Sequence, residues 1–180
     1  QHAGQHGQAE AGEQLAHHLR IAHFAQEHAG RQVADGRQLL HGRRDVALFF
    51  KSVHGTLNHL LVGETLLWFR RFAHGESPAL KLDREAEPDR ARLARAVLDG
   101  ALAWQGAIAD WPVARFDGRM TYVRTTGELM DLPFAPTLAH VFNHATHHRG
   151  QITAALTMLG QPGPELDLVF FLQTQETRTA

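Results

Sequence analysis

Four histidines fall within nine residues toward the C-terminal end of the chain, His140, His144, His147 and His148. Side chains four residues apart lie one turn above each other on an α-helix, so His140, His144 and His148 would form one stripe. Two neutral imidazoles at this spacing can share a metal ion, which is why such pairs recur in zinc enzymes. The segment therefore predicts a helix that carries part of a metal site.

Composition restricts the chemistry of such a site. The chain of 180 residues contains no cysteine, which excludes disulfides, thiolate zinc ligands and iron–sulfur clusters, so a metal would bind through nitrogen and oxygen. A formal net charge of −1 gives the chain as a whole no basic attraction for nucleic acid. There is no apolar run of the roughly 18 to 20 residues that span a bilayer, and no signal-peptide pattern. We expect a cytoplasmic protein without nucleic-acid or membrane partners.

Apolar residues recur at helical spacing in four stretches, which are residues 11–29, 46–73, 88–111 and 136–159. Pro88 and Pro136 suit the first turn of a helix, and Gly160 suits a helix end. Residues 1–10 have almost nothing to bury, and we expect them to be disordered. Four helices with little strand predict an all-α fold, an antiparallel four-helix bundle in a single domain over residues 11–180.

A short β-hairpin is predicted before the last bundle helix, within residues 114–131. Its turn is expected near Asp117 and Gly118, because Asp-Gly favours tight hairpin turns. A second polar turn falls at Thr126 and Gly127. After the fourth helix, residues 167–173 could add a short apolar turn of helix.

A metal site inside a bundle needs a ligand from a second, facing helix. His59 is the best candidate, because it lies in the middle of a predicted helix among leucines that would be buried. A hydrogen-bonded core histidine is the alternative reading. Spacing alone leaves the partner open, since His144 can pair with His140, His147 or His148.

Two segments carry a family resemblance. The sequence FNHATHHRGQ at residues 142–151, followed by Leu-Gly at 159–160 and Leu-Asp at 166–167, closely resembles the C-terminal motif of the DinB family of metal-binding bundle proteins. The sequence FKSVHGTLNHLL at residues 50–61 looks like the second-helix motif of the same family. This DinB/YfiT-like, damage-inducible family is unrelated to the DNA polymerase that shares its name. The resemblance covers roughly residues 46–173.

The resemblance implies a metal triad of His59, His144 and His148. It places His147 about 60° of helix rotation away, and it makes His140 a neighbour of the metal ligands one turn below. It also implies an up-down-down-up bundle with a long crossover, and a homodimer. Residues 1–45 depart from the family, because they lack its Tyr-Asn-x-Trp-Ala-Asn-like helix; one hypothesis is a shifted reading frame in a GC-rich gene.

Three nitrogen ligands leave a coordination position open, as in catalytic zinc sites. Family relatives include thiol-dependent transferases and isomerases, and others are described only as metal-dependent hydrolases. The first hypothesis is therefore a thiol-dependent S-transferase that acts on small electrophiles with a low-molecular-weight thiol as cofactor. The second is a hydrolase that uses metal-bound hydroxide, and the third is a non-catalytic metal-binding stress-response protein. Zinc is the expected metal, and nickel, copper or iron would also suit three imidazoles.

Three further residues are candidates for catalytic roles. Glu64 and His147 could serve as the general base of a hydrolase. Glu64 lies five residues past His59, about 140° around an α-helix, which favours a surface or interhelical carboxylate. Arg149 could neutralise an anionic substrate, or it could lie on the helix surface.

Overall fold

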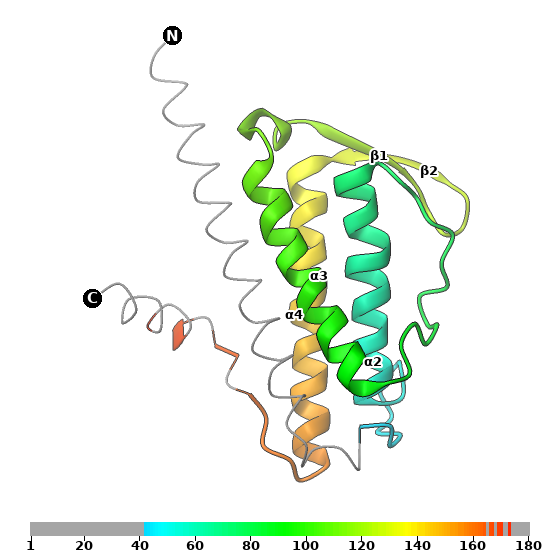
Figure 1. The fold of residues 1–180 in the computed structure, drawn as a ribbon, viewed down its shortest axis with the longest axis vertical. Coiled ribbons are helices and arrows are strands. Elements are labelled where there is room, and N and C mark those ends of the chain that lie inside the picture. The colour runs from blue at the N-terminus through cyan, green and yellow to red at the C-terminus, as the bar shows by residue number, and fades with distance from the viewer. Residues whose placement is uncertain (1–41, 165, 168, 171–172, 174–180) are drawn as a thin grey trace.

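The computed structural model describes residues 42–164, 166–167, 169–170 and 173. Three long helical stretches run side by side (Figure 1). The first consists of α2 (Val53–Leu60) and the π-helix η2 (Leu61–His74), which follows it directly. The other two are α3 (Arg90–Asp110) and α4 (Phe134–Met158). The described part of the chain is therefore mostly helical, as predicted. The predicted helix over residues 11–29 and the predicted disorder of residues 1–10 lie outside the described residues. None of the described helices is long and apolar enough to cross a membrane.

The third and fourth predicted helices are present with nearly the predicted bounds. α3 begins at Arg90 after Asp89, whose carboxylate accepts a hydrogen bond from the Arg92 backbone N–H at 2.9 Å and so caps the helix. α4 begins at Phe134 and has Pro136 in its first turn. Of the predicted helical turn at residues 167–173, residues 169, 170 and 173 are helical.

The predicted start of the second helix at residue 46 is wrong. The helix begins at Val53, and the Ser52 side chain caps it by accepting from the Gly55 N–H at 3.1 Å. Residues 46–51 instead form a closed turn, in which the Val46 N–H donates to the Lys51 carbonyl at 2.8 Å. Two non-glycine residues of this turn, Ala47 and Lys51, have left-handed φ angles of 58° and 67°. The apolar residues of this stretch are spaced as in a helix, but its backbone is not helical.

The hairpin is present, but its turn is not where the Asp-Gly signal placed it. The antiparallel strands β1 (Arg119–Val123) and β2 (Leu129–Pro133) cross one end of the helices (Figure 1). The chain reverses over residues 124–128, with Gly127 at a φ of 94°, a conformation that favours glycine. Gly118 forms a different turn, which follows the short 3₁₀ helix η3 (Val113–Arg115), and its N–H donates to the Arg115 carbonyl at 3.1 Å.

Two clusters of buried side chains form the core. An aromatic cluster lies toward the hairpin and consists of Phe72, Trp104, Ile108, Met120, Tyr122, Phe134, Leu138, Val141 and Phe142. An aliphatic cluster occupies the other end of the helices and consists of Val53, Leu57, Leu60, Leu61, Leu93, Val97, Ile152, Ala155 and Leu156. On α4, His144 and His148 lie in the sequence between Phe142 of the first cluster and Ile152 of the second. The two histidines therefore lie on α4 between the aromatic cluster and the aliphatic cluster.

Candidate metal centre

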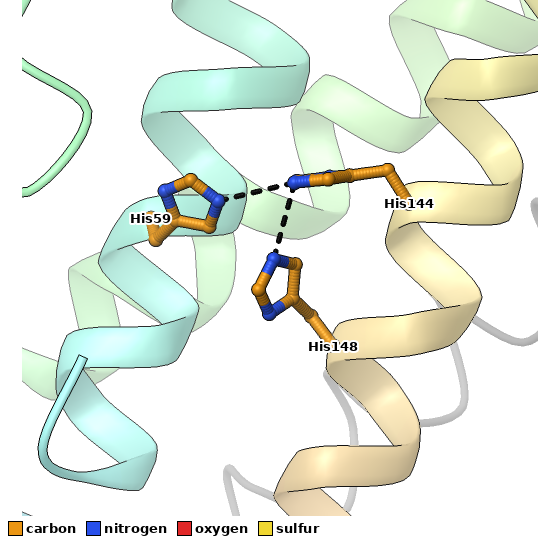
Figure 2. Close-up of side chains that lie close together, drawn as sticks. All are labelled: His59, His144 and His148. Atoms are coloured by element: carbon orange, nitrogen blue, oxygen red, sulfur yellow. Dashed lines mark hydrogen bonds between the residues drawn. The ribbon is translucent and has the colours of Figure 1, made fainter. Parts of the chain in front are cut away.

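Three histidines from two helices point their rings at one another (Figure 2). The Nε2 atom of His144 lies 3.2 Å from Nε2 of His59 and 3.1 Å from Nε2 of His148. One ring nitrogen from each residue lies within 4.8 Å of the other two, close enough for all three to hold one metal ion. His59 and His148 are buried and His144 is half-buried. The structure thus brings together the three residues that the family resemblance implied as ligands.

The other nitrogen of each ring faces an oxygen outside the centre. Nδ1 of His59 lies 2.9 Å from the Leu82 carbonyl oxygen, and Nδ1 of His148 lies 2.8 Å from Oε1 of Gln151. Because these oxygens can only accept, both Nδ1 atoms carry the hydrogen and donate it, which leaves a lone pair on each Nε2. Such outer hydrogen bonds fix the tautomer and the orientation of histidine ligands in metal proteins.

This pattern of lone pairs fits a cation. His59 and His148 both direct an Nε2 lone pair at Nε2 of His144, and that atom can carry one proton at most. Burial lowers the pKa of His59, and it lowers the pKa of His148 to about 4. Both rings are therefore neutral near pH 7, which is the protonation state that a metal ligand requires. A nitrogen-preferring divalent ion between the three Nε2 atoms would use all three lone pairs.

Glu64 lies beside the third histidine as an interhelical carboxylate, one of the two positions that the sequence favoured for it. Its Oε1 atom is 3.9 Å from Nδ1 of His144, too long for a hydrogen bond but close enough for an electrostatic interaction, and its side chain is 4% exposed. The estimate of 140° assumed an α-helix, whereas η2 is a π-helix from Leu61 onward, with i→i+5 hydrogen bonds. The wider turns bring Glu64 toward α4, where it is an interhelical carboxylate.

Glu64 is subject to opposing influences that together leave its pKa above the usual value. Burial raises the pKa of Glu64, while His144 and the Arg149 guanidinium act in the opposite direction. Arg149 is itself buried, and its Nη2 donates to Oγ1 of Thr146 at 2.7 Å. Arg149 therefore supports the buried carboxylate, rather than lying on an exposed helix surface.

The remaining two histidines of α4 lie at the edge of the centre. His147 is exposed, and its Nε2 is 3.0 Å from the Gln151 side-chain nitrogen. His140 is also exposed; its ring centroid is 5.9 Å from that of His144 and 5.7 Å from that of Trp68. Neither residue belongs to the group that could hold a metal ion.

Three contacts of the centre were missed at the level of sequence. The Phe50 ring stacks on His59 with a centroid distance of 3.8 Å and an interplanar angle of 16°. Phe50 lies in the closed turn that the sequence had assigned to a helix, so its position could not be anticipated. The Leu82 carbonyl left no sequence signal, because any residue would supply it. Gln151 could have been found, since it follows His148 by three residues on one helix face.

The fold and the geometry define a helical protein with a three-histidine candidate metal centre between two helices. The DinB family model matches residues 42–179, which is most of the chain. The chain therefore belongs to the DinB family. A search of curated proteins finds no match to it.

Proposed function

We propose that this protein binds one divalent metal ion through Nε2 of His59, His144 and His148, and uses it to activate a low-molecular-weight thiol. The reaction would be an S-transfer to a small electrophile. The observation that carries the proposal is the common orientation of the three rings, with every Nε2 inward and every Nδ1 toward an oxygen. Three protein ligands leave room for an external one.

The ligand set suits zinc first, and nickel or iron next, because imidazole is a good ligand for all three. A bound ion of this kind acts as a Lewis acid that lowers the pKa of a coordinated thiol or water. In the transferase reaction, the thiol gives its proton to solvent. The sulfur then forms a bond to the electrophilic carbon, and the leaving group departs with the bonding electron pair.

The chain's own residues hold the centre in place and keep water from part of it. Leu82 and Gln151 accept from the outer nitrogens and so keep the Nε2 lone pairs of His59 and His148 directed inward. A cation at the centre would favour the ionised form of Glu64, and its carboxylate would then favour a proton on Nδ1 of His144, which does the same for the third ring. Phe50 covers one face of His59, where it excludes solvent.

The positions of the candidate bases favour thiol transfer over hydrolysis. A hydrolase needs a general base close to the nucleophilic water. Glu64 lies beside Nδ1 of His144, whereas the ligand nitrogen is Nε2, so Glu64 is placed to orient the ring. His147 is exposed and bonded to Gln151. A free thiol is already far more acidic than water, so coordination brings its pKa below neutrality without such a base.

The test is turnover by protein purified without a metal-affinity column and then loaded with zinc. We would assay glutathione, bacillithiol and mycothiol, each with 1-chloro-2,4-dinitrobenzene, and compare the wild type with His144→Ala and with His147→Ala as the matched control. Zinc-dependent conjugation that His144→Ala abolishes and His147→Ala retains is the expected result. Ester hydrolysis without thiol turnover would support the hydrolase instead, and metal binding without either would support a non-catalytic protein.

A further inference from the structure

Two polar residues of the second-helix motif lie outside the metal triad, although they are as buried as its members. His54 and Asn58 are on α2, one turn apart, and Asn58 is 2% exposed. Burying such polar groups costs free energy unless they form hydrogen bonds. Their partners therefore indicate what these two residues hold in place.

Both residues bind the segment at positions 82–87. Asn58 uses both ends of its amide: Oδ1 accepts from the Glu87 backbone N–H at 2.8 Å, and Nδ2 donates to the Glu87 carbonyl at 3.1 Å. Nε2 of His54 lies 2.8 Å from Oε1 of Glu85 and 3.1 Å from Nδ2 of Asn58. Since the Glu85 carboxylate can only accept, the His54 Nε2–H donates to it, and the two hydrogens of the Asn58 amide go to the carbonyls of Glu87 and His54.

These bonds fix the backbone of the segment at Glu87, while the Arg92 guanidinium, at 3.1 Å from the Glu87 carboxylate, and the Arg43–Glu85 ion pair hold its side chains. Residues 82–87, all of them described, contain no helix or strand, so no regular ladder of backbone hydrogen bonds holds them. Their other end carries the Leu82 carbonyl that accepts from Nδ1 of His59. Helix α2 thus binds the segment at both ends, through Asn58 at Glu87 and through His59 at Leu82.

We infer that Asn58 is a positioning residue for the metal ligand His59: by fixing the Glu87 end of the segment, it holds the Leu82 carbonyl where His59 must donate. His54 supports the same segment through Glu85. This inference rests on the proposed metal centre, and Asn58 would act on the metal only through His59. Loss of the Asn58 amide would release the backbone at Glu87, and the Leu82 carbonyl would then hold the His59 ring less firmly.

The test uses Co²⁺ as a spectroscopic probe in the full chain. We would measure Co²⁺ affinity by chelator competition, the visible absorption bands, and the proton resonance of His59 Nδ1–H, for the wild type, Asn58→Ala and a control. The control is Thr56→Val, which removes another buried polar group of α2 whose hydroxyl donates to the Ser52 carbonyl and not to the segment.

Asn58→Ala is expected to weaken Co²⁺ binding by about 10-fold or more, the typical effect of losing an outer partner of a ligand. It should also change the absorption bands and broaden the His59 resonance by solvent exchange, while Thr56→Val leaves all three unchanged. If Asn58→Ala does not fold, the isosteric Asn58→Asp, which loses the donor to Glu87, is judged by the same criteria. Wild-type affinity, bands and resonance in the Asn58 variant would overturn the inference alone. A wild type that binds no Co²⁺ through the triad would overturn the proposed function, and this inference with it.

Discussion

The two halves of the candidate metal centre are built in different ways. The α4 half consists of His144 and His148 on one helix, and the partner of His148, Gln151, is on that helix as well. The α2 half consists of His59, whose partner is a carbonyl 23 residues away in an irregular segment. The first half depends on local helix geometry, while the second depends on tertiary contacts. This difference predicts which changes abolish the centre and which only weaken it.

The largest effect should come from the residue that joins the two halves. His144 has the only ring whose Nε2 approaches both other ligand nitrogens in the centre, at 3.2 and 3.1 Å. His144→Ala should therefore weaken zinc binding by more than about 100-fold, beyond the ~10- to 100-fold that loss of an outer partner alone produces. Competition with a chelator measures this, and His147→Ala is the control on the same helix. Equal affinities of the two variants would show that the α4 half is not organised around His144.

A smaller loss is expected for Glu64→Gln, which keeps the size of the side chain and removes its charge. In the metal-bound protein the cation would favour the ionised form of Glu64, and its carboxylate would favour a proton on Nδ1 of His144 and thereby an Nε2 lone pair for the metal. Zinc affinity should fall by about 10-fold, since this is the lower end of the range for outer partners. Competition with a chelator, as for His144→Ala, measures this change in zinc affinity. Unchanged affinity would mean that the α4 half needs no support from η2.

Gln151→Ala should cost less than Glu64→Gln. Gln151 is half-buried, so water can replace its oxygen as the acceptor for Nδ1 of His148. We expect zinc affinity to fall by a few-fold at most, well below the loss in Asn58→Ala. A larger loss in Gln151→Ala than in Asn58→Ala would reverse the contrast between a local half and a tertiary half.

The smallest effect is a pH dependence of the metal-free protein. Burial lowers the pKa of His148 to about 4, from 6.5 for the exposed ring. Below pH 6.5 the unfolded chain takes up a proton that the folded chain does not, so the stability of the fold should decline as the pH falls from 6.5 to about 4. Urea midpoints at several pH values measure the decline. The decline in stability should be shallower in His148→Asn than in the wild type, and unchanged in His147→Asn. The same slope in the wild type and both variants would contradict the assignment of this pH dependence to His148.

The same contrast explains how much of the site the sequence could reveal. The pairing of His144 with His148 follows from a spacing of four residues, although spacing alone did not exclude His140 or His147. His59 was a candidate because of its apolar neighbours, and the family motif selected it. Its supports at Leu82, Phe50 and Asn58 come from irregular backbone or from tertiary contacts, and such contacts have no period in the sequence.

The fold shows the same limit. The bounds of α3 and α4 were predicted to within two residues, because Pro88 and Pro136 mark their starts and Gly160 marks the end of α4. The closed turn at residues 46–51 was mistaken for helix because apolar spacing reports which side chains are buried and not the φ angles of Ala47 and Lys51. The π-helix η2 was not predicted, and its wider turns shift the direction of Glu64 from the one expected for an α-helix.

The central claim is that three imidazoles from two helices hold one metal ion. X-ray absorption spectroscopy of the zinc-loaded protein tests it most directly, with His59→Ala and His147→Ala measured beside the wild type. Three imidazole nitrogens at about 2.0–2.1 Å from the zinc are expected in the wild type and in His147→Ala, and two in His59→Ala. Two imidazoles in the wild type, or a spectrum that His59→Ala leaves unchanged, would contradict it.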